Sequence, residues 1–248
     1  MRIFITGIGG TIGTAFVDYL NKDHHIVGID RDETNVARIK KDYPNVDVSV
    51  GDFGDVTFVH GGIDLLIHLA AMKHIDLCEF NPSECVVNNV VKTQKLFKSA
   101  YENKVNILFM STDKAVEPIS TYGYTKALGE SMAVDYGGSF IRSGNIIASS
   151  GSVINLWEEA IENNKPIKIT HKDMRRYFIT AENLVERVWD QYMDGVRVII
   201  PKMDRDIYLI DLAKEVLSRY DYTIENYPPG IEYTGVRVGE KLAEKLYE

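Results

Sequence analysis

The chain has 248 residues, of which 45% are hydrophobic and 26% are charged, a composition typical of a globular protein with a sizeable core. Its formal net charge of −8 gives it no general electrostatic attraction to nucleic acid or to an anionic membrane surface. We expect neither as a partner, and no apolar run approaches the roughly 18–20 residues of a membrane-spanning helix.

Strands and helices are predicted to alternate along the first half of the chain. Short apolar runs predict strands at residues 3–6, 25–30, 46–50, 65–69, 106–111 and 139–142. Helix-period stretches between them predict helices at residues 11–21, 33–41, 82–102 and 120–135. This alternation predicts an α/β fold built on a doubly wound parallel sheet with helices on both faces.

The pattern loosens after residue 145, where short strands and small helices predict a small C-terminal substrate-binding lobe. We expect residues 1–145 to form the main domain, with residues 181–202 returning to it. The reduced lobe is expected to consist of residues 146–180 and 203–248.

A glycine-rich turn follows the first predicted strand and opens the first predicted helix. Its spacing fits a dinucleotide fingerprint of the Rossmann type, in which glycines allow a tight turn, close approach to a pyrophosphate and close helix packing. The helix N-terminus then faces the phosphates with unpaired N–H groups and a partial positive charge. We expect Gly7, Gly10, Thr11, Ile12 and Gly13 to bind the cofactor.

The residues after the second and third predicted strands bear on the choice of cofactor. Asp30 can accept hydrogen bonds from the adenosine ribose and would repel a 2′-phosphate, which favours NAD. Arg31 leaves NADP open, because an arginine there can pair with a 2′-phosphate. Asp52 and Phe53 follow the third strand, and we expect them near the adenine.

A Tyr-x-x-x-Lys spacing places Tyr122 and Lys126 on one face of a predicted helix. A lysine ammonium beside a phenol favours the phenolate and lowers the pKa of the phenol, so Tyr122 is a candidate base. The pair follows Ser111-Thr112, where a strand is predicted to end, and ligands bind at such strand ends in open α/β sheets. Tyr124 has no lysine four residues later and is expected to be structural.

Several segments together resemble a known family. They are residues 6–13, 70–74 (Ala-Ala-Met-Lys-His), 111–115 (Ser-Thr-Asp-Lys-Ala), 122–126, 142–145, 151–154, 174–180 and 235–242. The chain resembles the extended short-chain dehydrogenases over nearly its whole length. More narrowly, it resembles the inverting UDP-N-acetylglucosamine 4,6-dehydratases of the polysaccharide-biosynthesis group.

The resemblance implies a redox-neutral dehydration of a UDP-sugar with a tightly bound NAD or NADP. Tyr122 would deprotonate the hydroxyl on carbon 4 while hydride moves to the nicotinamide, and Lys126 would hold the nicotinamide ribose. Lys114 would then take the proton from carbon 5, and Asp113 would protonate the leaving hydroxyl on carbon 6. Hydride returns to carbon 6, and Thr112 would hydrogen-bond the sugar. The implied product is a 4-keto-6-deoxy sugar nucleotide with inverted carbon 5.

The resemblance also implies binding roles for residues elsewhere in the chain. The cofactor would contact Leu69, Ala70, Ala71, Lys73 and Asn89, as well as Tyr122 and Lys126. The substrate would contact Lys73, His74, Asn145, Ser152, Val153, Arg176, Arg237 and Glu240. No metal site is expected.

The sequence departs from the family pattern in its shortened C-terminal lobe and at three positions. Arg175 stands where threonine is usual, Val238 where proline is usual and Ala243 where histidine is usual. These departures leave the hexose and the nucleotide open. Two other functions also stay open: a sugar-nucleotide 4-epimerase or ketoreductase on the same fold, and a non-catalytic nucleotide-binding regulator.

Location and assembly complete the expectations. Cys78 and Cys85 are predicted to be packed thiols, and the N-terminus lacks the pattern of a signal peptide, so we expect a soluble protein of the cytoplasm. By the same resemblance we expect a dimer or higher homo-oligomer, formed through the predicted helices at residues 82–102 and 120–135.

Overall fold

The computed structural model describes residues 1–58, 62–147, 149, 152–203 and 206–247. Its centre is a seven-stranded sheet in the order β10-β6-β5-β4-β1-β2-β3, and every pair of neighbours in it is parallel. The strands are β1 (Arg2–Thr6), β2 (His25–Asp30), β3 (Asp47–Val50), β4 (Leu65–His68), β5 (Asn106–Met110), β6 (Ser139–Ile141) and β10 (Val198–Ile199). The predicted α/β fold with a parallel Rossmann-type sheet is confirmed.

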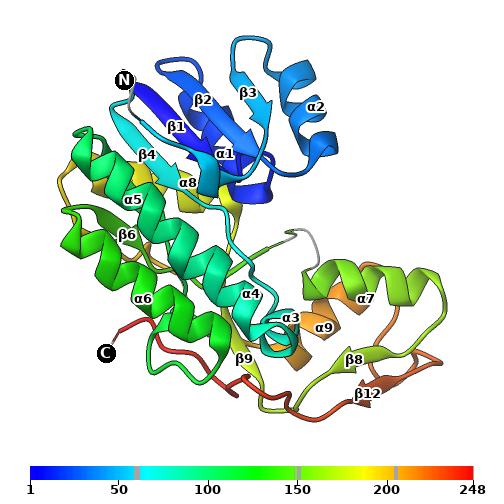
Figure 1. The fold of residues 1–248 in the computed structure, drawn as a ribbon. Helices are drawn as coiled ribbons and strands as arrows, with labels where there is room; N and C mark the ends of the chain where they lie inside the picture. Colours follow the sequence, from blue (N-terminus) through cyan, green and yellow to red (C-terminus); the bar gives the residue numbers. More distant parts are fainter. Residues whose placement is uncertain (59–61, 148, 150–151, 204–205, 248) are drawn as a thin grey trace.

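Helices cover both faces of this sheet (Figure 1). One face carries α1 (Thr11–Leu20), α2 (Glu33–Asp42) and α8 (Ala181–Met193); the other carries α4 (Pro82–Val86), η2 (Val87–Lys92), α5 (Thr93–Glu102) and α6 (Thr121–Asp135). Successive residues of a strand point to opposite faces of the sheet, so alternate side chains pack into the two hydrophobic cores on those faces. On β5, Leu108 packs with α1 and α8, whereas Ile107 and Phe109 pack with α5 and α6.

The predicted helix at residues 82–102 is interrupted in the structure. A π-helical turn, η2, separates α4 from α5, and a further short helix, α3 (Ile75–Phe80), precedes them. Asn88 and Asn89 of the π turn are buried. Such turns inside helices are frequent at functional sites, because the extra residue redirects side chains.

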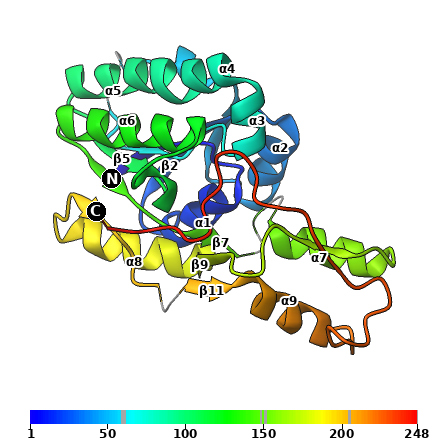
Figure 2. The same cartoon turned by 90° about the horizontal axis from the view of Figure 1, so that it is seen from below.

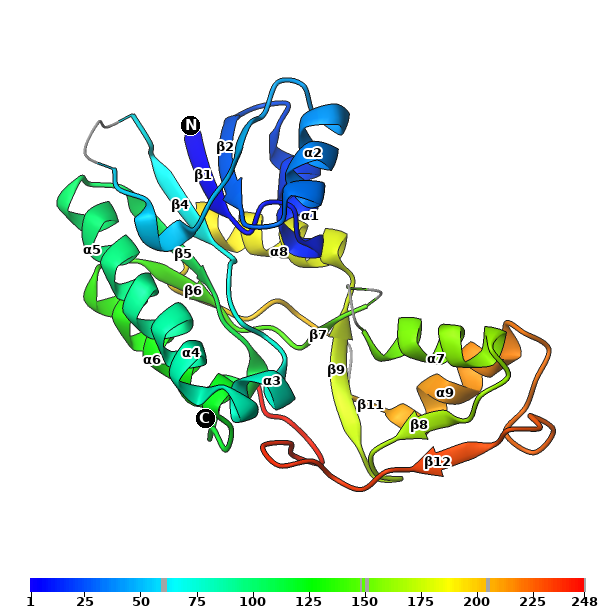
Figure 3. The same ribbon diagram turned by 45° about the vertical axis from the view of Figure 1, so that its right-hand side comes forward.

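The C-terminal lobe has its own small core. Helices α7 (Val153–Glu162) and α9 (Leu209–Ser218) pack on a strand pair, β8 (Ile167–Ile169) and β12 (Ile231–Tyr233), around the buried Trp157. A second sheet, in the order β11-β9-β7, joins the lobe to the main domain through β11 (Asp206–Tyr208), β9 (Arg175–Ile179) and β7 (Asn145–Ile146). Figure 3 shows β9 running between the two parts. The exact domain boundaries stay a prediction.

The final segment of the described chain, residues 234–247, crosses from the lobe back to the main domain, and we call it the C-terminal strap. Figure 2 shows it passing from the side of α7 and α9 toward α6 and α8. Its contacts with distant parts of the chain include those of Lys241 with Val116 and of Leu246 with Arg142.

Two further observations concern the outer surface. Within the described ranges, no helix is both long enough and apolar enough to cross a bilayer. Apolar side chains are exposed on the α3–α5 and α6 side, among them Leu77, Phe80, Val87, Val91, Tyr124 and Leu128. This face includes the helices predicted to pair in an oligomer, and the oligomeric state stays a prediction.

Candidate active site

A cavity of about 630 Å³ lies at the carboxyl ends of the central strands, where ligands bind in open α/β sheets. Most of the predicted site residues line it. They are Gly7, Gly10, Thr11, Ile12, Gly13, Asp30, Arg31, Phe53, Leu69, Ala70, Ala71, Lys73, His74, Thr112, Lys114, Tyr122, Lys126, Asn145, Ser152 and Val153. The structure adds lining residues that were not predicted as site residues: Ile29, Asn35, Gly51, Met110, Ser111, Gly144, Ile146, Ser149 and Phe178.

The glycine-rich turn needs its glycines at both ends. Gly7 has a φ of +70°, and a Cβ there would lie 3.0 Å from the backbone nitrogen of Ala70. A Cβ on Gly13 would lie 2.4 Å from the carbonyl oxygen of Gly7. Gly10 is the N-cap of α1 and no side chain caps it. This backbone cradle and uncapped helix fit the pyrophosphate of a dinucleotide.

Asp30 is held in place at the end of β2. Its Oδ2 accepts a hydrogen bond from the Gly9 amide at 3.0 Å, and its Oδ1 accepts one from the Asp32 amide at 3.1 Å. The carboxylate lines the cavity beside Arg31, so a ribose entering this end would meet a fixed acceptor.

Asp52, predicted to lie near the adenine, is not among the residues that line the cavity. Its carboxylate contacts Lys92 Nζ at 2.6 Å and caps the short helix η1 (Phe53–Asp55) through the Gly54 amide. Partial burial raises the pKa of Asp52, but the hydrogen bonds from Lys92 and Gly54 outweigh it and the net pKa is lowered. The neighbouring Phe53 lines the cavity in its place.

The adjacent Asp113 and Lys114 face in different directions. Lys114 lines the cavity, and its Nζ donates to Asp113 Oδ1 at 2.9 Å and to Asn145 Oδ1 at 3.2 Å. Asp113 is fully buried, does not line the cavity and accepts a second hydrogen bond from Thr112 Oγ1 at 3.0 Å. In this geometry the carboxylate orients the amine, whereas the proposed acid–base pair would need both groups at the substrate.

Tyr122 and Lys126 are both almost completely buried and line the cavity. Burial, and then the negative charge of Asp113, raise the pKa of Tyr122, while the neighbouring Thr112 hydroxyl opposes them. Lys126 Nζ donates to the Met110 carbonyl oxygen at 2.7 Å, and burial lowers the pKa of Lys126 to about 8. The expected lowering of the phenol pKa by Lys126 is therefore not what the structure shows.

Asn89 supports the site without lining the cavity. Its Oδ1 accepts from the Met72 amide at 2.8 Å, and its Nδ2 donates to the Met72 carbonyl at 2.9 Å and to Thr125 Oγ1 at 3.2 Å. It thereby joins the loop after β4 to helix α6. Sequence reasoning placed Asn89 at the cofactor, and the structure places it behind this loop.

Cys78 and Cys85 lie close by, in a buried cluster with Tyr122. Burial is the largest cause of a raised pKa for the Cys78 thiol, and its hydrogen bond with Cys85 adds to it. Within the described chain both thiols are free, as the prediction of packed thiols expected.

The structure contains a buried charge network near Lys126 that was not predicted from the sequence. Glu130 accepts from Ser111 Oγ at 2.5 Å and from Arg142 at 2.6 and 3.1 Å. Glu130 lies four residues after Lys126 on α6, and its charge opposes the lowering of the pKa of Lys126. The four-residue spacing of Lys126 and Glu130 on one predicted helix was the sequence signal that could have revealed this network.

Of the three arginine and glutamate residues predicted to bind the nucleotide, two line a cavity and one does not. Arg237 and Glu240 line a smaller cavity of about 180 Å³ together with Lys73, His74 and Lys114, which also line the main cavity. Arg176 lines neither: it is buried, and its Nη1 donates to the carbonyls of Arg175 and Leu242. Burial lowers the pKa of Lys73, the residue between the two cavities.

Comparison with known proteins identifies relatives along the whole chain. The family model described as "Polysaccharide biosynthesis protein" matches residues 3–248. The capsular polysaccharide biosynthesis protein CapD of Staphylococcus aureus is 33% identical over 98% of this chain, which spans 44% of that relative's length. A UDP-N-acetylglucosamine 4,6-dehydratase (inverting) of Campylobacter jejuni and a UDP-glucose 4-epimerase of Rickettsia bellii are each 30% identical, over 98% of this chain and 76% of their own.

Solved structures agree on the architecture. Pen from Bacillus thuringiensis superimposes with a TM-score of 0.91 at 29% identity, covering 100% of this chain and 82% of that one. DesIV from Streptomyces venezuelae, a dTDP-glucose 4,6-dehydratase solved with NAD and TYD bound, superimposes with a TM-score of 0.88 at 19% identity. The superposition covers 100% of this chain and 88% of the DesIV chain. At 19% identity, the similarity to DesIV shows a shared fold and nothing further.

Proposed function

Because the chain belongs to the family of polysaccharide biosynthesis proteins, we propose that it is an enzyme that removes water from a UDP-sugar with a bound nicotinamide cofactor. The reaction would be that of a UDP-N-acetylglucosamine 4,6-dehydratase that inverts carbon 5. The observation that carries the proposal is the Lys114 amine, which lines the same cavity as Tyr122 and the glycine-rich turn. Relatives of that name, 30% and 29% identical, support it.

The first step uses the residues at the end of β5 and the start of α6. Tyr122 would take the proton from the hydroxyl on carbon 4, with the Thr112 hydroxyl beside the phenol. The glycine-rich turn and Lys126 would hold a nicotinamide cofactor, which when bound would supply reversible hydride acceptance beside Tyr122. Lys126, held on the Met110 carbonyl, would steady the ribose beside it.

The second step uses Lys114. Once carbon 4 is a ketone, the proton on carbon 5 is acidic, and a neutral amine in the cavity can remove it. Asp113 and Asn145 fix the Nζ through hydrogen bonds of 2.9 and 3.2 Å. Because Asp113 is fully buried, its role as acid for the leaving hydroxyl would require the loop to move, whereas its role in orienting Lys114 does not.

A panel of UDP- and dTDP-sugars, read by mass spectrometry, tests the proposal. With UDP-N-acetylglucosamine we expect a product lighter by the mass of one water, formed without added cofactor, because the hydride is returned in each cycle. Proton NMR in heavy water would then give the configuration at carbon 5. Accumulation of reduced cofactor in proportion to product would contradict the redox-neutral scheme.

We propose NAD as the cofactor, and Asp30 as the residue that selects it. Asp30→Asn removes the negative charge but keeps the shape, so we expect weaker NAD binding and stronger NADP binding to the cofactor-free protein. Each tenfold change in the ratio of dissociation constants corresponds to about 1.4 kcal/mol. Titration calorimetry measures both constants.

Asp32→Asn is the matched control for Asp30. Asp32 is the N-cap of α2 and does not line the cavity, and asparagine caps a helix equally well. Its NAD-to-NADP ratio should equal that of the unaltered protein. An unchanged ratio in Asp30→Asn would remove Asp30 as the selecting residue.

A 4-epimerase is the second candidate, favoured by two observations. Relatives named UDP-glucose 4-epimerase are as similar as the dehydratases, and Asp113 lies outside the cavity where an elimination acid would act. An epimerase needs Tyr122 and the cofactor but no base at Lys114. Its product would have the mass of the substrate, so the same mass measurement separates the two functions.

A further inference from the structure

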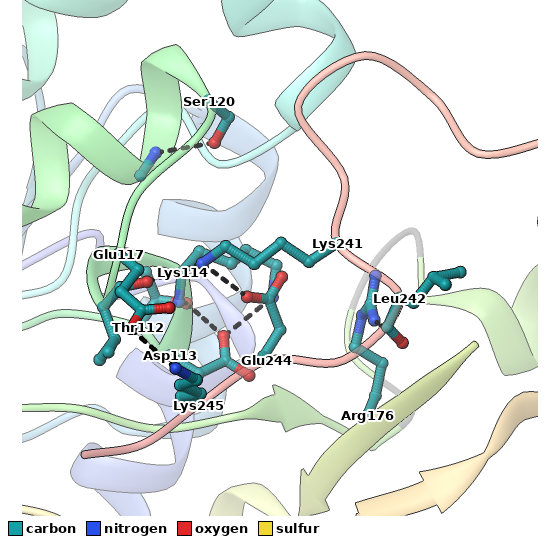
Figure 4. Close-up of polar contacts among 12 residues, drawn as sticks. Thr112, Asp113, Lys114, Glu117, Ser120, Arg176, Lys241, Leu242, Glu244 and Lys245 are labelled. Carbon is teal, nitrogen blue, oxygen red and sulfur yellow. Dashed lines mark hydrogen bonds and ion pairs between the residues drawn. The ribbon is translucent and has the colours of Figure 1, made fainter. Parts of the chain in front are cut away.

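The C-terminal strap makes several contacts with the loop that carries Thr112, Asp113 and Lys114. We call residues 112–120, between β5 and α6, the catalytic loop. Figure 4 shows Lys241 and Lys245 of the strap beside this loop. Lys245 Nζ lies 2.7 Å from Glu117 Oε1, and Lys241 Nζ donates to the Val116 carbonyl at 2.6 Å.

The contact of Lys241 is the buried one of the two. The Lys241 side chain is 18% exposed, and its Nζ lies 3.3 Å from the carboxylate of Glu244, which is 2% exposed. By contrast, the Lys245–Glu117 pair is more than 60% exposed on both sides, and exposed ion pairs contribute little. A largely buried ammonium beside a buried counter-charge holds the Val116 carbonyl more firmly than a solvated pair can.

Val116 closes the turn that sets the direction of Lys114. Its amide donates to the Asp113 carbonyl at 3.2 Å, at the end of the single-turn helix η3 (Asp113–Ala115). Within this turn Asp113 faces the interior and Lys114 the cavity. Lys241 lines neither cavity, and its hydrogen bond to the catalytic loop is the one to the Val116 carbonyl.

The same strap is tied to the lobe. The carbonyl of Leu242, the residue after Lys241, accepts from the Arg175 amide at 2.9 Å and from Arg176 Nη1 at 3.2 Å. Both arginines lie on β9, the strand whose Phe178 lines the main cavity. Two successive strap residues therefore join the substrate lobe to the catalytic loop.

The start of α6 is held by the strap as well. Gly239 has a φ of +80°, and a Cβ there would lie 2.9 Å from Ser120 Cβ. Ser120 is the N-cap of α6, and its hydroxyl accepts a hydrogen bond from the Gly123 amide. These two residues flank Tyr122 in the first turn of the helix. The strap thus lies against the middle of the catalytic loop, at Val116 and Glu117, and against its end at Ser120.

We propose that Lys241 is a positioning residue that holds the catalytic loop in its working geometry and couples it, through Leu242, to the substrate lobe. Its effect on turnover rests on the proposed function, whereas its effect on the loop does not. Removing the ammonium would leave nucleotide binding intact and let the Lys114 amine move from its place.

The kinetic experiment compares Lys241→Met with Lys245→Met. Methionine keeps the apolar stem of Lys241 but cannot donate to Val116. Because a small misplacement of a reacting group costs about 10²-fold in rate, we expect kcat for UDP-sugar dehydration to fall by about that factor in Lys241→Met. The dissociation constant for UDP should stay unchanged, Lys241→Arg should recover most of kcat, and Lys245→Met should match the unaltered enzyme.

Hydrogen–deuterium exchange of the peptide that covers residues 112–120 provides a readout without turnover. Lys241→Met should speed exchange in this peptide, and Lys245→Met should not. If Lys241→Met does not fold, Glu244→Gln, which removes only the counter-charge, should give a smaller change of the same kind.

The outcomes separate the inference from the proposed function. Unchanged hydrogen–deuterium exchange of the 112–120 peptide in a folded Lys241→Met protein overturns the positioning role. A weaker binding of UDP that accounts for the whole fall in dehydration rate overturns it as well. If the unaltered protein dehydrates no sugar in the panel, the proposed function fails, and exchange alone decides the role of Lys241.

Discussion

Replacing Tyr122 by phenylalanine is expected to abolish the oxidation of the sugar and, with it, every later step. The phenol is the group that takes the proton from the hydroxyl on carbon 4, and general bases of this kind contribute about 10²–10⁴-fold to rate. Since the side chain is 9% exposed and phenylalanine fills the same space, the fold and the cofactor should remain. The measurement is product formation by mass spectrometry, together with the absorbance of reduced nicotinamide in a single turnover.

Tyr124→Phe is the matched control for this change. Tyr124 lies two residues away on the same helix, is 56% exposed and does not line the cavity. We expect it to turn over at the rate of the unaltered enzyme. Reduced nicotinamide forming at a normal rate in Tyr122→Phe would show that another group starts the oxidation.

Replacing Lys114 by alanine is expected to stop the reaction one step later. The sugar would be oxidised at carbon 4, because Tyr122 and Lys126 are unaltered, but the proton on carbon 5 would stay in place. We therefore expect reduced nicotinamide to build up on the enzyme, with no product lighter by one water and no deuterium uptake at carbon 5. The loss of dehydration should again be about 10²–10⁴-fold.

Lys114→Arg distinguishes the base from a mere positive charge. Arginine keeps a cation beside Asp113 and Asn145 but is never deprotonated in a protein, so it cannot accept the proton. It should be as inactive in dehydration as Lys114→Ala. Full dehydratase activity in either variant would remove Lys114 as the base.

The main domain was predictable because its signals are local. The strand and helix periods and the glycine spacing need only neighbouring residues, and the structure has strands in all six predicted positions of the first 142 residues. The glycine-rich turn and Asp30 line one cavity because they directly follow or end a parallel strand, and such ends meet at one edge of the sheet. Lys114 and Tyr122 reach the same cavity from the loop and the helix that follow β5.

The residues whose position was not predictable depend on distant partners. The direction of Arg176 is set by the carbonyl of Leu242, which lies 66 residues later. Asp113 turns inward and Lys114 outward because of a single-turn helix that leaves no periodic signal. Asn89 faces the loop after β4 because a π turn shifts it from the α-helical register, and no pattern in the sequence predicts that turn.

The buried thiols beside Tyr122 allow local opening of this part of the protein to be measured by chemical labelling. Cys78 and Cys85 have no exposed surface, and burial raises the pKa of Cys78, so an alkylating reagent reaches neither sulfur while the helices stay packed. Modification must wait for α3 and α4 to separate from α6. The rate of alkylation at low reagent concentration therefore reports the free energy of that local opening, and a ligand that bridges these helices would slow it.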